Sequence, residues 1–163
     1  MVFERDIDGI EVKLRIDDYE DPSKHDFGDV WCDCGYSFRF GNAINYYKDH
    51  DEILTPEEVD ELVIVLSELL DGKVSEPREV PMTEPDFFFM LYPQKDLRTD
   101  PKYTYVAPGY EIQDIYVEWR IYFWNGGLTD NFLTITLDRG DIEAFRDFLN
   151  SLTRRTGTLR MNW

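Results

Sequence analysis

Residues 112–124 read Ile-Gln-Asp-Ile-Tyr-Val-Glu-Trp-Arg-Ile-Tyr-Phe-Trp, a long run in which apolar and polar side chains alternate. A period of two is typical of a β-strand with one face toward a core. The face predicted to be buried carries Ile115, Val117, Trp119, Ile121 and Phe123. The opposite face carries Asp114, Tyr116, Glu118, Arg120 and Tyr122. A strand of this kind needs partners on both sides and a layer to cover its apolar face.

The next elements along the chain provide a neighbouring strand and a helix. Asn125-Gly126-Gly127 has the composition of a turn, and residues 131–137 form the next predicted strand. A helix is expected over about 141–152, capped by Asp138 or a nearby polar residue. Its predicted buried side chains are Ile142, Phe145, Phe148, Leu149 and Leu152. The short connection between the strands predicts antiparallel pairing.

Before residue 112 the chain holds a long connection and a second apolar strand. Residues 94–108 contain prolines, charges and tyrosines and are expected to form a surface connection. Residues 87–92 are apolar on both alternations, which predicts a central strand covered on both faces. This strand follows a proline-rich connector.

The clearest helix signal is Thr55-Pro56-Glu57-Glu58, which joins an N-cap hydroxyl, a proline at the first helical position and a capping-box glutamate. Apolar residues then follow at spacings of three and four up to Leu70, and Gly72 can end the helix. The predicted apolar face comprises Val59, Leu62, Val63, Leu66, Leu69 and Leu70. This face is expected to lie on a sheet.

The first third of the chain is predicted to be mainly strands. Residues 2–6 and 10–17 alternate around Asp8-Gly9, a dipeptide suited to a hairpin turn. A strand over 30–40 and a short strand over 43–47 follow an acidic loop at 18–29. Together these elements predict an α+β fold in a single domain, 1–163: a curved antiparallel sheet or partial sandwich covered by two amphipathic helices.

Charge is the most informative global property. The chain holds 34 acidic and 17 basic residues, a net charge of −17, and residues 1–60 contribute 17 of the acids and only 6 of the bases. Such a field repels nucleic acid and anionic membranes and attracts a basic protein. A surface made acidic for solubility alone explains the charge equally well. No apolar run is near the roughly 20 residues of a membrane span and the start is not signal-like, so a cytoplasmic location is expected. The chain is expected to be a monomer or a weak dimer.

The sequence offers no positive evidence for catalysis, a metal or a cofactor. His25 and His50 both fall in predicted acidic loops and are expected to be surface residues. Cys32 and Cys34 lie two apart on a strand, where core packing as reduced thiols is favoured over zinc binding. We therefore expect no enzyme; the alternative is a small-ligand- or carbohydrate-binding domain, or a carboxylate-dependent hydrolase.

Tyrosines gather in the second half of the chain, at positions 103, 105, 110, 116 and 122. Tyrosines amid carboxylates make good hot spots of a protein interface. Alternatively, they pack beneath the connection at 94–111. The sequence leaves both readings open.

The order of the pieces resembles a known family. The series consists of a strand that follows Glu84-Pro85-Asp86, a long strand that ends at Trp119–Trp124, and Phe132–Asp138 leading directly into the helix at Ile142–Leu149. With the helix at 55–70 and the strands of the first half, this layout resembles the WapI-type immunity proteins of bacterial polymorphic-toxin systems.

The resemblance implies that the chain binds a cognate toxin domain, often a nuclease, and neutralises it without itself being an enzyme. No binding residue can be transferred from the family. As a hypothesis, we nominate the carboxylates of two acidic segments as partner-binding residues: Asp17, Asp18, Glu20, Asp21, Asp26, Asp29, Asp49, Asp51 and Glu52.

Overall fold

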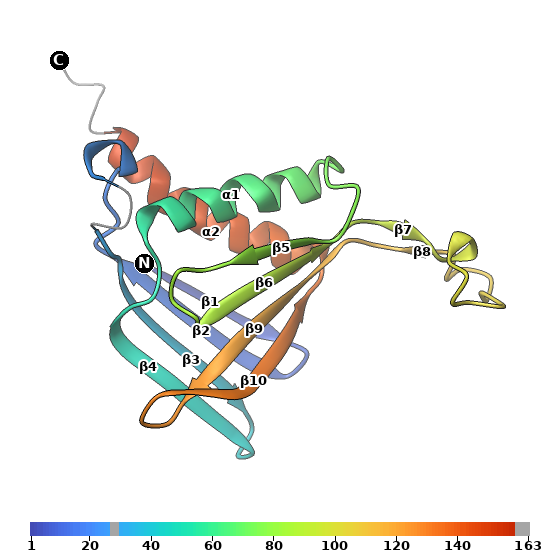
Figure 1. The fold of residues 1–163 in the computed structure, drawn as a ribbon, viewed down its shortest axis with the longest axis horizontal. Coiled ribbons are helices and arrows are strands. Elements are labelled where there is room, and N and C mark those ends of the chain that lie inside the picture. Colours follow the sequence, from blue (N-terminus) through green and yellow to red (C-terminus); the bar gives the residue numbers. More distant parts are fainter. Residues whose placement is uncertain (27–29, 159–163) are drawn as a thin grey trace.

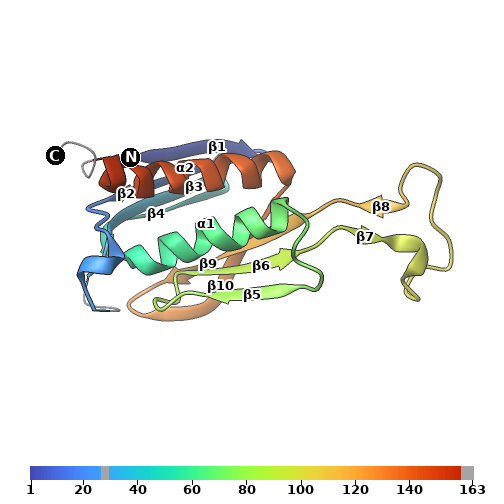
Figure 2. The same cartoon turned by 90° about the horizontal axis from the view of Figure 1, so that it is seen from above.

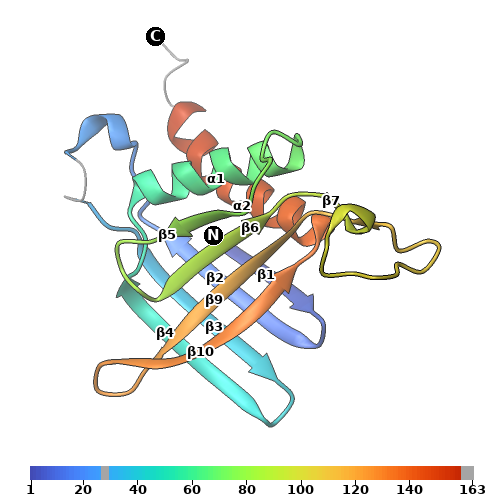
Figure 3. The same ribbon diagram turned by 45° about the vertical axis from the view of Figure 1, so that its right-hand side comes forward.

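A computed structural model describes residues 1–26 and 30–158, with the backbone alone for 155–158. It contains two four-stranded antiparallel sheets, a small two-stranded sheet and two long helices. The expected α+β class is confirmed. The strands of the two large sheets cross one another, and both helices lie over one end of the pair of sheets (Figures 1 and 3).

Sheet 1 is formed by the first half of the chain in the order β1-β2-β3-β4. Its strands are β1 (Val2–Ile7), β2 (Ile10–Asp17), β3 (Asp33–Phe40) and β4 (Ile44–Glu52). The predicted hairpin at Asp8-Gly9 is confirmed, since both residues have positive φ angles of 51° and 85° and join β1 to β2. Between β2 and β3 lies a short 3-10 helix, η1 (Pro22–Lys24).

Sheet 2 is formed by the second half in the order β10-β9-β6-β5. Its strands are β5 (Arg78–Pro81), β6 (Phe87–Tyr92), β9 (Tyr116–Trp124) and β10 (Leu128–Leu137). On β9 the alternation read from the sequence holds, because Val117, Trp119 and Ile121 are buried. The predicted strand at 112–124 is interrupted at 114–115, so that residues 112–113 belong to the two-stranded sheet.

The helices are α1 (Pro56–Leu70) and α2 (Arg139–Thr158), which lie side by side and run in opposite directions (Figure 2). The predicted caps are confirmed. Thr55 and Glu58 form the reciprocal capping box of α1, and the Asp141 amide donates to Asp138 Oδ1 at 2.9 Å at the start of α2. α2 is longer than predicted at both ends.

The core joins both sheets and α2 around Trp119, which is fully buried. Its ring stacks on Phe145 of α2 at 5.3 Å and on Phe89 of β6 at 5.5 Å, and it meets Phe38 of sheet 1 edge-on at 5.5 Å. Offset and edge-to-face ring contacts of this kind add to the free energy gained by burial. The crossing of the two sheets is therefore filled mainly by aromatic rings.

The connection at 94–111 is more structured than expected. β7 (Lys95–Asp96) pairs with β8 (Ile112–Gln113), and a 3-10 helix, η2 (Leu97–Thr99), follows β7. These elements form an arm that projects beyond the ends of β6 and β9, away from the rest of the protein (Figures 1 and 2).

Further details of the strand and helix predictions are wrong, among them the proline-rich connector, which contains β5. β6 has one buried face and one half-buried face, and Phe88 and Met90 lie on the half-buried face. In α1, Val65 is buried whereas Val63 and Leu70 are half-buried. The acidic segment 49–52 is the end of β4 rather than a loop, since β4 runs on to Glu52 and pairs with β3.

Candidate partner-binding site

Strand register brings acidic residues together at one end of sheet 1. Asp17 of β2 pairs with Asp33 of β3, and Asp33 pairs in turn with Glu52 of β4. Asp18 follows β2 directly, and Asp49 and Asp51 lie near the end of β4, just before Glu52. We call this set of six carboxylates the acidic end: Asp17, Asp18, Asp33, Asp49, Asp51 and Glu52.

Arg15 lies at the centre of the acidic end and partly neutralises it. Its Nη1 lies 2.6 Å from Asp17 Oδ2 and 3.2 Å from Asp33 Oδ2, and its Nη2 lies 2.8 Å from Asp49 Oδ1. The guanidinium lowers the pKa of Asp33 and Asp49, while the pKa of Asp17 is lowered first by the Met1 amino group, 2.7 Å away, and then by Arg15. These three acids therefore stay ionised well below neutral pH.

A bulge in β4 exposes His50. The pairing of β3 with β4 shifts register between Cys34 and Tyr36, and His50 has a φ of +52°. Its side chain is 74% exposed, and its Nδ1 lies 2.9 Å from Asp33 Oδ2. The expectation of a surface histidine at position 50 is confirmed, but it lies on a strand and not in a loop.

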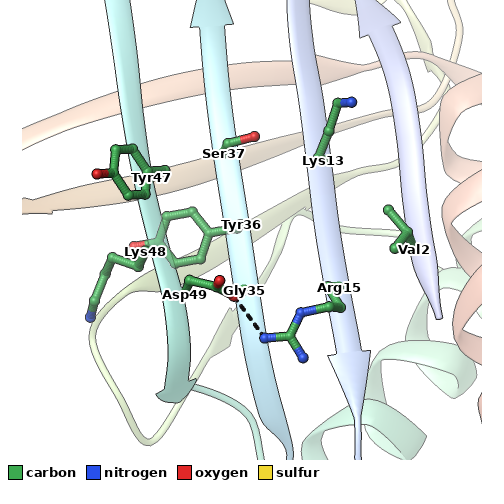
Figure 4. Close-up of a pocket in the computed structure, with 9 residues that line it drawn as sticks. All are labelled: Val2, Lys13, Arg15, Gly35, Tyr36, Ser37, Tyr47, Lys48 and Asp49. Atoms are coloured by element: carbon green, nitrogen blue, oxygen red, sulfur yellow. Dashed lines mark hydrogen bonds and ion pairs between the residues drawn. The ribbon is translucent and has the colours of Figure 1, made fainter.

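Gly35 makes room for the charges that meet above β3. Arg15 reaches over Gly35 to Asp49 on the outer face of sheet 1 (Figure 4). A Cβ atom on Gly35 would lie 2.5 Å from Asp49 Oδ1 and 3.1 Å from Arg15 Nη2. Beside this bridge is an open depression of about 370 Å³, lined by residues that include Lys13, Ser37 and Tyr47.

A second charged cluster ties sheet 1 to sheet 2 next to the acidic end. Asp86, only 2% exposed at the start of β6, accepts hydrogen bonds from Tyr36 Oη at 2.8 Å and Lys48 Nζ at 2.9 Å. Lys48 also pairs with Asp51 and lies 4.7 Å from the centre of the Trp124 ring. Burial lowers the pKa of Lys48, but the two carboxylates outweigh this effect and raise the pKa overall.

A cavity of about 410 Å³ lies between the two sheets, and its walls include Lys48, Asp86 and Trp124.

Not every nominated residue joins the acidic end. Glu20 pairs with His25 at 2.6 Å, and Asp21 caps η1 by accepting from the Ser23 amide. This segment is tied to α1 because Tyr19 Oη donates to Asp60 Oδ1 at 2.6 Å. Asp26 is exposed, and Asp29 lies outside the described residues.

The sequence did not point to Arg15, Asp33, Lys48 or Asp86. Each lies on a predicted strand or next to one, where a single charged residue does not by itself indicate a functional site. Only the strand register places Arg15 among three carboxylates, and only the packing of the sheets places Asp86 beside Lys48. The one pattern in the sequence that could have indicated this site is a basic residue with acidic residues near it on strands that are predicted to pair.

Both cysteines are buried and free, as predicted for reduced core residues. Burial raises the pKa of Cys34 to about 12, so the thiol stays protonated. Nowhere in the described part of the chain do three or more His, Cys, Asp or Glu side chains converge as metal ligands would. None of the helices in residues 1–26 and 30–158 combines the length and the apolarity needed to cross a bilayer.

A carboxylate with a raised pKa would be one mark of a catalytic acid. Asp60 has one, because burial outweighs the opposing hydrogen bond from Tyr19. It lies on α1 and lines neither the depression over Gly35 nor the cavity between the sheets. Asp60 therefore ties the loop that holds Tyr19 to α1 and lies outside both hollows.

Two antiparallel sheets with two helices packed on them define the class of this protein as α+β. Residues 2–157 match the model of the Immunity protein WapI-like family, so the chain belongs to that family. The resemblance seen in the sequence is confirmed over nearly the whole chain. No curated protein and no solved structure matches it.

Proposed function

We propose that this chain neutralises a cognate toxin by binding it through the acidic end of sheet 1, without catalysing a reaction. The observation that carries the proposal is membership of the WapI-like immunity family, which implies toxin neutralisation. The acidic end supports it because five of the nine nominated carboxylates gather there: Asp17, Asp18, Asp49, Asp51 and Glu52.

Electrostatics indicate what kind of toxin would bind. Within the described residues, the six carboxylates of the acidic end pair with four basic groups: the Met1 amino group, Arg15, Lys48 and His50. The local excess of negative charge matches the net charge of −17 of the whole chain. A basic toxin domain, such as a nuclease that holds a polyanion, would be drawn to this surface from a distance. We place this encounter in the cytoplasm.

Rigidity also favours the acidic end as an interface. Arg15 cross-links three strands of sheet 1 through Asp33 and Asp49, and Lys48 of β4 joins sheet 1 to Asp86 of sheet 2. Charges held in place lose little conformational entropy when a partner binds. A toxin would therefore meet an ordered pattern of charge.

The test uses the toxin domain encoded beside the gene for this chain. Co-expression should restore growth of cells that the toxin otherwise kills. The triple variant Asp18→Asn, Asp49→Asn, Glu52→Gln removes three exposed charges and should weaken binding by at least about 10-fold, measured by calorimetry at 50 mM salt.

A matched control separates the site from the net charge. The triple variant Glu79→Gln, Asp130→Asn, Glu143→Gln removes three exposed carboxylates elsewhere and leaves the same net charge. It should bind as the parent protein does. Equal weakening by both triples would remove the acidic end as the site, and no binding by the parent at low salt would remove the proposed function.

A further inference from the structure

The arm, residues 93–113, has no core of its own and yet is well organised. Every one of its residues is at least partly exposed. Polar contacts hold it instead: Lys95 Nζ lies 2.6 Å from Asp100 Oδ2, Arg98 binds Asp96 through both its Nε and its Nη2, and the Leu97 amide donates to the Glu111 carbonyl at 2.8 Å. The arm is therefore a defined surface and not a loose connection.

The charge of the arm sets it apart from the rest of the chain. Its three bases, Lys95, Arg98 and Lys102, equal in number its three acids, Asp96, Asp100 and Glu111. The arm is thus neutral, and the whole net charge of −17 belongs to the remainder. A like-charged copy of the chain could approach the arm with less repulsion than any acidic surface would give.

Aromatic side chains mark the outer part of the arm. Tyr105 is 75% exposed, Tyr110 is 71% exposed and the nearby Ile112 is 51% exposed. Tyrosine gives a large contact area at a low cost in conformational entropy, and it is enriched at the centre of interfaces. Within the described chain, nothing covers these rings.

A cavity at the base of the arm is large enough to hold a tyrosine ring. Its volume is about 480 Å³, and its walls include Pro77, Pro93 and the rings of Tyr92, Tyr103 and Tyr116. Tyr92 and Tyr116 stack in parallel with centroids 4.3 Å apart. The cavity is large enough for one tyrosine side chain and offers aromatic faces and edges for it to pack against.

We propose that two copies of this chain associate through their arms, which pack antiparallel so that one outer tyrosine of each copy binds in the cavity at the base of the other arm. A two-fold symmetric dimer requires a self-complementary surface. The arm meets this requirement, because the outer part of each arm contacts the base of the other. The proposal does not depend on the toxin.

The shape of the arm favours this geometry for a strongly acidic protein. Antiparallel arms place the two bodies at opposite ends of the contact, because each arm projects away from its own body (Figures 1 and 2). Even four extended residues span about 13 Å, more than the Debye length of about 10 Å at 0.1 M salt. The repulsion between the two bodies is therefore weakened at 0.1 M salt and is stronger at lower salt.

The test measures the mass of the full chain by sedimentation equilibrium from 10 µM to 1 mM, roughly the range of the dissociation constants of weak dimers. We expect a dimer that becomes tighter as NaCl rises from 50 to 500 mM, because salt screens repulsion between the bodies and the arms carry no net charge. The double variant Tyr105→Ser, Tyr110→Ser should weaken the dimer by at least about 10-fold.

Tyr47→Ser is the control, since Tyr47 is 69% exposed on the outer face of sheet 1, remote in sequence from the arm. It should leave the dimer unchanged. A monomer at every concentration, or a dimer that the arm variant leaves intact, would overturn the proposal. The proposal would also be overturned if the parent protein and the arm variant were both monomers and the variant bound the toxin domain more weakly. The arm would then be part of the toxin-binding surface. Far-ultraviolet circular dichroism of the arm variant checks that it folds.

Discussion

At Gly35 the lack of a side chain lets Arg15 and Asp49 meet across β3. Gly35 is buried although it lies on the outer face of sheet 1, because the ion pair covers it. Its φ angle is not positive, so the glycine is required by space and not by backbone conformation.

Gly35→Ala should therefore separate the ion pair at little cost to folding. Asp49 is 59% exposed and can rotate away, and alanine is the better strand residue, so the free energy of unfolding should change by less than about 1 kcal/mol. The pKa of Asp49 should rise toward its ordinary value, as followed by carboxyl NMR titration. Ser37→Ala, two residues along β3, is the control, and an unchanged pKa of Asp49 in Gly35→Ala would contradict the account.

The contacts of Arg15 should also make the free energy of unfolding depend on pH. The pKa values of Asp17, Asp33 and Asp49 are lowered in the folded protein, so their contribution is present above the unfolded pKa of about 3.9 and is lost as the pH falls through the lowered values. In Arg15→Met, the loss of stability between pH 7 and pH 3, measured by urea unfolding, should be smaller than in the parent.

Lys13→Met serves as the control for this experiment, since Lys13 lies on the same face of β2 and pairs with Glu4 at 2.8 Å. It removes one cation without touching the three acids. If Lys13→Met flattened the pH dependence as much as Arg15→Met does, the effect would belong to net charge and not to the Arg15 contacts.

Among the elements, α1 has the clearest start, and its cap also anchors the helix to sheet 2. Glu58, only 5% exposed, accepts from the Thr55 amide at 2.9 Å, and its other oxygen accepts from the Thr83 amide in the turn between β5 and β6. The capping box recognised in the sequence thus has a tertiary contact that the sequence does not show.

Glu58→Ala should consequently destabilise the protein more than Thr55→Ala. Loss of the Thr55 hydroxyl removes one capping bond, worth about 1 kcal/mol. Loss of the Glu58 carboxylate leaves the buried Thr55 amide without an acceptor and also breaks the bond to the exposed Thr83 amide, at about 2 kcal/mol in all. Urea unfolding measures both. Glu61→Ala, an exposed position of the same helix, should change the free energy of unfolding by less than about 0.5 kcal/mol. Equal losses for Glu58→Ala and Thr55→Ala would show that the Thr83 contact contributes nothing.

At the scale of the whole molecule, α2 closes the space where the two sheets cross. Phe145 is fully buried and packs 5.2 Å from the ring of Phe3 in sheet 1, 6.1 Å from Phe89 in sheet 2 and 5.3 Å from Trp119. One side chain thus contacts both sheets at once.

Phe145→Ala should therefore cost about 3 to 5 kcal/mol, the range for a large cavity in a core. Because both sheets lose a contact, thermal unfolding followed by tryptophan fluorescence and by circular dichroism should shift together to lower temperature. Phe132→Ala, at a ring 47% exposed on β10, is the comparison and should cost far less. Unfolding of one sheet before the other in Phe145→Ala would contradict the shared core.

The sequence by itself determined the class of the fold and its long strands and helices, but not β5, which lies in the predicted proline-rich connector. Alternation on β9, the hairpin at Asp8-Gly9 and the caps of α1 and α2 all depend on neighbours within a few residues, so they could be read locally. The arm was read as a plain connection because its strands are two residues long and held by polar contacts.

The tertiary structure alone decided how the strands divide into two crossing sheets and which charges meet. Register placed Asp17, Asp33 and Glu52 in one row, and the packing of the sheets brought Asp86 to Tyr36 and Lys48. These pairs are 16 to 50 residues apart in the chain, and no local pattern specifies contacts at such separations. They depend on which strands pair and in which register, and hydrophobic burial across the whole core settles both.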